Sequence, residues 1–144
     1  MAKTNNSPIE MRLLSVNEVS FSMKAGIIGE EDRGDVLQLG FKHELHPNLT
    51  DDLFSLDFGV QYSIDGQTLL ESIYRYDFEV KELSKYVDIS NEGKITVRDI
   101  LPHLESVAVG TMRGILVVRT AGTDLARYPI PMIDPIELCN NLAK

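Results

Sequence analysis

The sequence contains a single cysteine, no tryptophan and no long run of apolar residues. Because Cys139 has no second cysteine to pair with, a disulfide within the chain is excluded. Nothing approaches the roughly 20 consecutive apolar residues that a membrane-spanning helix needs. Residues 1–8 are polar and small, without the apolar stretch of an export signal. We therefore expect a protein that stays in the cytoplasm.

Positive charge is also scarce: 14 Lys and Arg residues stand against 22 Asp and Glu residues, which gives a formal net charge of -8. Such a surface repels phosphate backbones and anionic lipids, so nucleic acids and membranes are poor candidate partners. A chain of 144 residues with 43% hydrophobic content can bury one ordinary core. We expect a single domain over residues 1–144, with residues 1–10 as a disordered leader.

No arrangement of residues typical of catalysis or metal binding is found. Cys139 has no nucleophile motif around it, and His103 has no serine or cysteine partner that would make it a general base. His43 and His46 are three positions apart, so on a strand their side chains point to opposite faces. We expect no enzyme activity, no cofactor and no metal site.

The clearest element is a strand over residues 54–64, where apolar and polar residues alternate strictly. Asp65 and Gly66 follow it and can adopt the positive φ angles of a tight hairpin. A further alternating strand over residues 70–80 completes the hairpin. One apolar and one polar face is the pattern of an antiparallel sheet that is covered on one side.

Two strands are expected before this hairpin, over residues 9–24 and 36–45, joined by a glycine-rich loop. Pro47 should end the second of them. The first has an interrupted alternation that predicts a bulge or a two-sided start. Its expected apolar face contains Leu13, Val19, Phe21 and Met23.

After an irregular stretch around residues 86–93, the apolar spacing changes to about 3.6, the period of a helix. Thr96 or Asp99 can cap the helix start, and Pro102 is tolerated only in its first turn. A short turn over 96–100 followed by a long helix is the expected arrangement. Its expected inner face contains Ile100, Leu104, Val107, Ala108, Thr111, Ile115 and Val118.

Gly122 should end the long helix, and prolines should keep residues 125–133 extended. Asp134 can then cap a short final helix with Pro135 at its first position. The predicted fold class is α+β: a four-stranded antiparallel sheet packed on one face by a long helix, with a short C-terminal helix.

Gly110 and Gly114 lie within the long helix, where each glycine costs about 1 kcal/mol relative to alanine. A packing reason is therefore expected. Two explanations for these glycines remain open: the close approach of a second helix in an oligomer, or close packing on the protein's own sheet.

Several apolar residues lie in segments without regular periodicity, where they must either pack under a loop or stay available to a ligand. Together with one residue of the second strand, they form the predicted binding groove. These residues are Ile27, Ile28, Phe41, Leu125, Tyr128, Ile130 and Met132.

Three features of the sequence together resemble one known family. The first is Glu18-Val-Ser-Phe21, an acid, aliphatic, Ser, Phe signature in the first strand. The second is Tyr76-Asp-Phe78-Glu-Val80 at the end of the fourth strand, and the third is the order of the helix start Ile100-Leu-Pro102 and the proline-bearing stretch 128–134. These features are similar to the corresponding parts of the SecB-like family of protein-export chaperones.

The resemblance implies a homotetramer, a dimer of dimers whose helices pack between the dimers and whose grooves hold unfolded, pre-export polypeptide without ATP. It also implies docking to the export translocase motor through the open sheet face. Glu18, Leu69 and Glu71 fall at the corresponding positions, while Ser22 stands where the family has an acid.

The residue pattern and the resemblance lead to three hypotheses about the function of the protein. The first is an ATP-independent holdase that buries apolar client segments in the groove and pairs with them at an exposed strand edge. The second is a SecB-like partner dedicated to one client, such as an antitoxin or one secreted protein. The third is a small-molecule binding protein, which the order of elements disfavours.

Overall fold

The computed structural model describes residues 8–24 and 37–143. Four strands form one antiparallel sheet in the order β1-β4-β3-β2, and two short strands form a separate hairpin. The elements are β1 (Met11–Met23), β2 (Leu37–Asn48), β3 (Leu53–Ile64), β4 (Gln67–Val80), the 3-10 turn η2 (Leu83–Lys85), β5 (Val87–Ile89), β6 (Ile95–Val97), α1 (Leu101–Arg119), the 3-10 turn η3 (Asp124–Arg127) and α2 (Pro135–Leu142).

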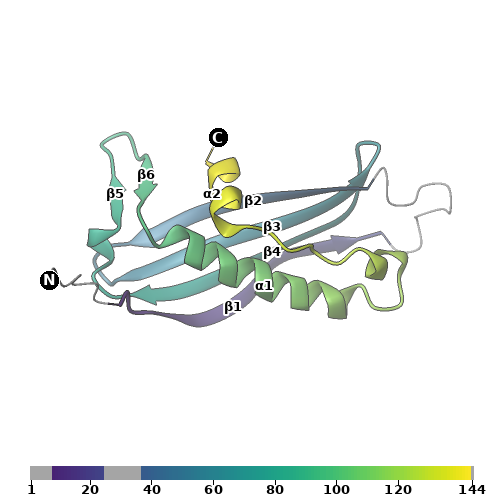
Figure 1. Ribbon diagram of the computed structural model, residues 1–144, viewed down its shortest axis with the longest axis horizontal. Coiled ribbons are helices and arrows are strands. Elements are labelled where there is room, and N and C mark those ends of the chain that lie inside the picture. Colours follow the sequence, from purple (N-terminus) through teal and green to yellow (C-terminus); the bar gives the residue numbers. More distant parts are fainter. Residues whose placement is uncertain (1–7, 25–36, 144) are drawn as a thin grey trace, which may run out of the picture.

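The long helix α1 runs along one face of the sheet, and the segment that leads to α2 crosses the same face nearer to β2 (Figure 1). None of the described helices covers the opposite face of the sheet, which is called the open face below. This is the predicted α+β arrangement of a four-stranded sheet, a long helix and a short C-terminal helix. Within the described residues, no helix is long and apolar enough to cross a membrane.

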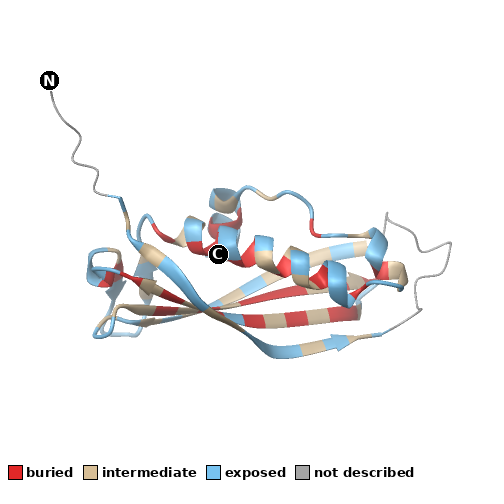
Figure 2. Ribbon diagram, turned by 90° about the horizontal axis from the view of Figure 1, so that it is seen from below, coloured by how far each residue is buried: buried red, intermediate tan, exposed pale blue. Residues whose placement is uncertain are grey.

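The core lies between the two central strands and α1, as the buried residues in Figure 2 show. The strict alternation of β3 has the predicted result, because its apolar side chains are almost completely buried: Phe54, Leu56, Phe58 and Val60. Asp65 and Gly66 adopt φ angles of 50° and 79°, which confirms the tight hairpin between β3 and β4.

Strand β1 contains the predicted irregularity. Its register with β4 shifts between Leu13 and Ser15 and again between Glu18 and Ser20. Each extra residue turns the following side chains over to the other face. The expected place of Val19 beside Phe21 is therefore wrong: Val19 is 51% exposed, and the register places Glu18 opposite Tyr74.

Strand β2 is longer than predicted. Pro47 does not end it but pairs with Phe54, and the strand continues to Asn48. Because β2 is an edge strand, a proline whose nitrogen faces away from β3 costs no ladder hydrogen bond.

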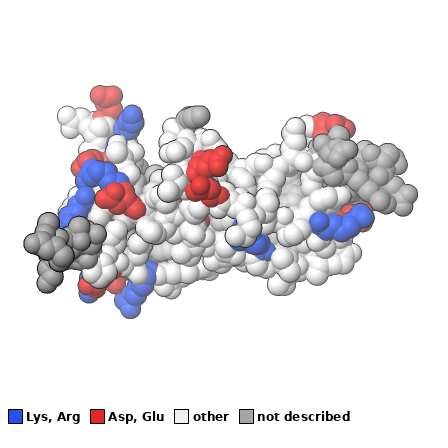
Figure 3. Space-filling model, in the orientation of Figure 1, with Lys and Arg blue, Asp and Glu red and all other residues white. Residues whose placement is uncertain are grey.

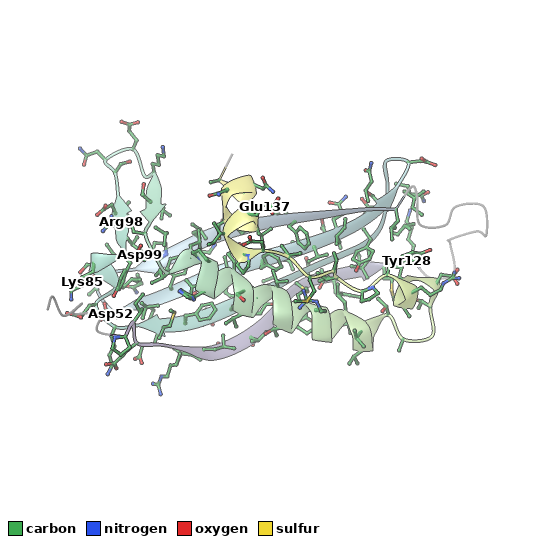
Figure 4. The ribbon with its side chains drawn as sticks, in the orientation of Figure 1. Asp52, Lys85, Arg98, Asp99, Tyr128 and Glu137 are labelled. Atoms are coloured by element: carbon green, nitrogen blue, oxygen red, sulfur yellow. The ribbon has the colours of Figure 1, made fainter. Side chains whose placement is uncertain are left out.

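The hairpin of β5 and β6 was not predicted. It occupies most of the stretch 86–100 that was expected to be irregular or a turn. Val87 is buried and anchors it, and Arg98 donates to the Asp88 carboxylate and to the Lys85 carbonyl oxygen at its base (Figure 4).

Helix α1 begins at Leu101 with Pro102 in its first turn, as expected, but Ile100 precedes it and makes no side-chain cap. The proposed caps are wrong because Thr96 lies in β6 and Asp99 has a φ of 68°. The predicted inner face is partly wrong. Val107 and Val118 are exposed, whereas Glu105, Val109 and Met112 are buried.

The C-terminal helix begins as predicted. The Asp134 side chain accepts a hydrogen bond of 2.9 Å from the Ile136 backbone N–H, and Pro135 occupies the first turn. The cap fixes where the extended segment ends and α2 begins.

Candidate functional site

The edge strand β2 carries a row of apolar side chains that the rest of the structure covers only in part. Leu37, Leu39, Phe41 and Leu45 alternate along one face and are all half-buried. The ring of Phe41 stacks on Phe58 of β3 with a centroid distance of 5.8 Å. Among the described residues, β3 is the only strand that pairs with β2. The apolar row therefore lies beside an unpaired backbone edge.

Side chains hold the extended segment 128–133 above the sheet. The Tyr62 hydroxyl donates to the carbonyl oxygen of Tyr128 at 2.5 Å. Arg113 of α1 donates to the carbonyl oxygens of Ile130 and Pro131 at 2.8 and 2.7 Å. These bonds satisfy backbone groups that the proline-bearing segment could not satisfy in a regular ladder. The segment is thus fixed between α1 and β3.

The residues predicted to form a groove are not equally accessible. Phe41 and Tyr128 are half-buried, and Met132 is 91% exposed. Leu125 and Ile130 are only 4% and 2% exposed, so their side chains belong to the core. Figure 4 places Tyr128 near the η3 end of the segment. The other two predicted residues, Ile27 and Ile28, lie outside the described residues.

Met132 borders a small hollow between α1 and α2. Its volume is about 110 Å³, and its lining includes Val109, Arg113, Ile133 and Leu138. Small-molecule sites usually measure roughly 300 to 1,000 Å³. The hollow is too small for such a ligand.

A buried histidine–carboxyl pair joins α1 to the edge strand. Glu105 is completely buried, and both its carboxylate oxygens lie 3.3 Å from Nδ1 of His43. Burial, and to a lesser extent the nearby Glu105, raise the pKa of the Cys139 thiol to about 11. A thiol that stays protonated at neutral pH is a poor nucleophile.

Sequence reasoning missed this pair, although one signal was present. His43 falls on the apolar parity of β2, between Phe41 and Leu45. A polar residue at such a position needs a partner from the covering layer. Only the position of α1 on the sheet identifies that partner as Glu105.

The structure separates the three residues expected to form a docking face. Glu18 turns toward α1 and accepts hydrogen bonds from Arg119 at 2.7 Å and from Tyr74 at 2.9 Å. Those bonds hold the pKa of the Glu18 carboxyl below its usual value. Leu69 is 3% exposed, at a register irregularity in β4. Glu71 lies 3.4 Å from Lys42 of β2 on the open face.

The two glycines of α1 lie on its outer side. A side-chain Cβ added at Gly110 or Gly114 would meet nothing within 4 Å, so close packing on the protein's own sheet does not explain them. Exposed apolar residues accompany them on the helix: Val107, Val117 and Val118. Figure 3 shows few charged side chains along this part of the surface, between the hairpin end and the η3 end.

The open face of the sheet is covered by cross-strand polar contacts. Arg75 donates two hydrogen bonds to Asp57, at 2.7 and 2.8 Å, and these hold the pKa of that carboxyl below its usual value. His46 Nε2 lies 3.4 Å from oxygens of both Asp57 and Glu44. Within the described residues, these three are the one group close enough to share a metal ion. Arg75 already occupies Asp57, and the expectation of no metal site stays a prediction.

No known protein family and no curated protein matches the sequence. A SecB-like chaperone of Mycobacterium tuberculosis, solved in complex with a ChAD peptide of an antitoxin, has a similar structure. The TM-score is 0.53 at 11% identity, over 85% of this chain and 88% of that chain.

A protein of unknown function from Streptococcus agalactiae has a TM-score of 0.42 at 12% identity, over 88% of this chain and 99% of that chain. At 11% identity, the likeness to the SecB-like chaperone establishes the fold but not the activity. The chain therefore has a fold similar to that of a SecB-like chaperone.

Proposed function

We propose that the protein is an ATP-independent chaperone of the cytoplasm that holds extended apolar segments of unfolded or pre-export polypeptides. The observation that carries this proposal is the half-buried apolar row of β2, beside a backbone edge with which no described strand pairs. Apolar client side chains would gain about 25 cal/mol per Å² that they remove from water there. The net charge of -8 adds a preference for basic segments.

The surface is suited to a polypeptide more than to a small molecule. Its apolar side chains spread along a strand and do not surround an enclosed cavity. Tyr128 and Met132 extend the apolar surface along the C-terminal segment, which Tyr62 and Arg113 hold in place. The similar fold of a SecB-like chaperone solved with a bound peptide supports polypeptide clients in general.

A second candidate is a partner dedicated to one client. The similar SecB-like chaperone was solved with an antitoxin peptide, which gives this alternative a specific basis. The two candidates differ in selectivity, because a dedicated partner would bind one client and ignore unfolded proteins in general.

We also propose that the protein acts as a homo-oligomer, a dimer of dimers. The outer side of α1 supports a helix-to-helix contact, since Gly110 and Gly114 leave room for a close approach and Val117 and Val118 are exposed beside them. A hollow of about 310 Å³ between α1 and β1, lined by Leu13 and Val107 among others, adds to this surface.

We also propose that the protein docks to the export translocase motor through the open face of the sheet. Of the three predicted residues, Glu71 is on the open face, whereas Glu18 binds Arg119 and Leu69 is buried. Co-sedimentation with a purified motor, repeated with Glu71→Lys, would test it: undiminished binding by that variant would exclude this face.

The function is tested by diluting a chemically unfolded protein into buffer with and without this chain, without ATP, and following aggregation by light scattering. Suppression near stoichiometric ratio supports a general holdase. The double variant Tyr128→Ser/Met132→Ser should suppress aggregation less, while its melting temperature stays close to that of the wild type. Ile89→Ser, an exposed apolar position on β5, is the matched control and should behave like the wild type.

A further inference from the structure

A histidine and two carboxylates lie together on the open face of the sheet, near the end of β2 that contains Pro47. Glu44 and His46 are two positions apart on β2, so their side chains point to the same face. Asp57 of β3 stands opposite Glu44 in the register of the two strands. The uninterrupted pairing of β2 with β3 therefore brings three side chains of metal-ligating types to one place.

The distances between these groups fit ligands around one metal ion. Nε2 of His46 lies 3.4 Å from a carboxylate oxygen of Glu44 and 3.4 Å from one of Asp57. A usual N–H···O hydrogen bond is shorter, about 2.7 to 3.2 Å. In a tetrahedral zinc site with bonds of about 2.0 to 2.1 Å, neighbouring ligand atoms lie about 3.3 to 3.4 Å apart. The three atoms lie within 4.8 Å of one another, and no other group of three such side chains in the described part of the chain does.

Arg75 of β4 fixes the orientation of Asp57. Its Nε and Nη2 groups donate to the two oxygens of that carboxylate, at 2.7 and 2.8 Å. Carboxylates that bind metals are themselves hydrogen-bonded in this way. A carboxylate has about four lone-pair positions, so each oxygen of Asp57 keeps one that Arg75 does not use. With Glu44 beside it, the site has two carboxylates against one guanidinium, and this net negative charge attracts a cation.

The open face gives an ion access to the three groups. Glu44 and His46 are exposed, and a hollow of about 200 Å³ on the same face is lined in part by Glu44 and Asp57. Lys42 also lines this hollow, but its ammonium lies 3.4 Å from Glu71. The nearest lysine therefore has a carboxylate partner of its own outside the site.

We propose that Glu44, His46 and Asp57 form a binding site for Zn²⁺. One imidazole with two carboxylates suits zinc better than calcium or magnesium, which take oxygen ligands in larger numbers. Three protein ligands leave a fourth position for water on the solvent side. The inference is independent of the proposed function.

This site replaces the sequence-based expectation of no metal. That expectation considered His46 together with His43, whose side chain does point to the other face, toward Glu105. The partners of His46 are instead carboxylates, one on its own strand and one on the neighbouring strand. The second of them, Asp57, follows only from the register of β2 with β3.

The test titrates zinc chloride into the full chain after treatment with a chelator and follows binding by isothermal titration calorimetry. We expect one ion per chain. Glu44→Gln and His46→Gln should each weaken binding at least about tenfold, since losing even an outer hydrogen-bond partner of a ligand costs that much. Because both residues are exposed, the melting temperature without metal should stay close to that of the wild type.

Two control variants remove similar groups elsewhere. His103→Gln changes an exposed histidine of α1, and Glu79→Gln changes a carboxylate of β4 that pairs with Arg12. Both should bind zinc as the wild type does. Wild-type affinity in Glu44→Gln and His46→Gln, equal losses in the controls, or no binding at millimolar zinc would overturn the inference.

The identity of the ion is tested with two competitors and one probe. An excess of Ca²⁺ or Mg²⁺ should leave zinc binding unchanged, and competition by either would show a general acidic surface instead of this site. Co²⁺ in place of zinc should give the strong visible absorption of tetrahedral coordination. The weak spectrum of octahedral Co²⁺ would contradict the assignment.

Thermal unfolding and native mass locate the ion within one chain. Zinc should raise the melting temperature of the wild type, because the ion binds the folded chain, and should leave that of His46→Gln unchanged. An equal rise in both would place the ion elsewhere. One ion per two chains, with a zinc-dependent increase in native mass, would assign it to a contact between copies and overturn the inference.

Discussion

Tyr62 of β3 donates its hydroxyl hydrogen to the carbonyl oxygen of Tyr128, 2.5 Å away, and so ties a central strand of the sheet to the C-terminal segment. The hydroxyl is enclosed, and burial raises the pKa of Tyr62 to about 12. One bond thus joins the core to a segment of the proposed client surface, with consequences for stability and for binding.

Alkaline pH should destabilise the protein through this residue. The pKa of tyrosine is near 10 in an unfolded chain and about 12 for Tyr62 in the folded protein, so the folded state stays protonated to a higher pH. Its contribution to stability is complete below pH 10 and is lost as the pH rises from 10 to 12. Urea unfolding at a series of pH values should show that the free energy of unfolding falls less steeply between pH 10 and 12 in Tyr62→Phe than in the wild type. The same decline in this variant as in the wild type would contradict the assignment, and Tyr86→Phe is the control.

The same variant should loosen the C-terminal segment. Tyr62→Phe leaves the Tyr128 carbonyl without this donor, at a cost of about 1 kcal/mol. Hydrogen exchange of residues 126–134 should become faster, while exchange in β3 stays unchanged. Equal acceleration throughout the chain would show a global effect instead.

The His43–Glu105 pair should behave as a coupled unit. His43→Leu alone leaves the buried Glu105 carboxyl without its hydrogen-bond partner, and we expect a loss of roughly 3 kcal/mol in the free energy of unfolding. The double variant His43→Leu/Glu105→Leu should lose much less, because well-packed apolar residues can replace a buried pair. Additive losses in a double-mutant cycle would contradict the coupling.

Replacing the two glycines of α1 with alanine should affect the stability of the protein and its assembly in opposite directions. Gly110→Ala/Gly114→Ala should raise the helix stability by about 1 kcal/mol per site, since each added Cβ meets open space. If a second copy packs there, native mass by light scattering should fall in the same variant. A rise in stability with unchanged mass would assign the glycines no role in assembly.

Buried and exposed residues of the C-terminal segment should respond differently to serine. Leu125→Ser places a hydroxyl in the core and should cost about 2 to 5 kcal/mol. Met132→Ser changes an exposed residue and should alter stability by less than about 0.5 kcal/mol. Thermal unfolding distinguishes the two, and a similar loss in both variants would show that Met132 is part of the core.

The sequence predicts those parts of the fold where a local pattern has a single structural solution. The alternation of β3, the Asp65-Gly66 turn and the Asp134 cap are of this kind. Prediction fails where tertiary contacts decide. Val19 is displaced by a bulge that depends on the partner strand, and Pro47 is tolerated because β2 has one neighbour.

In the candidate site too, tertiary contacts decide what the local sequence pattern could not predict. Phe41 is only half-buried because it lies on an edge strand, whereas Leu125 of η3 is buried in the core, and the local sequence reveals neither. The His43–Glu105 pair joins residues 62 positions apart in the chain. Only the position of α1 on the sheet brings them together.

The central claim, that polypeptide binds along β2, is tested most directly by hydrogen exchange of the wild-type protein with and without a permanently unfolded client, in the absence of ATP. The account predicts slower exchange in residues 37–48 and 128–133 when the client is present, with β1 unchanged. Protection confined to β1 and α1, or no protection at a client concentration that saturates binding, would contradict it.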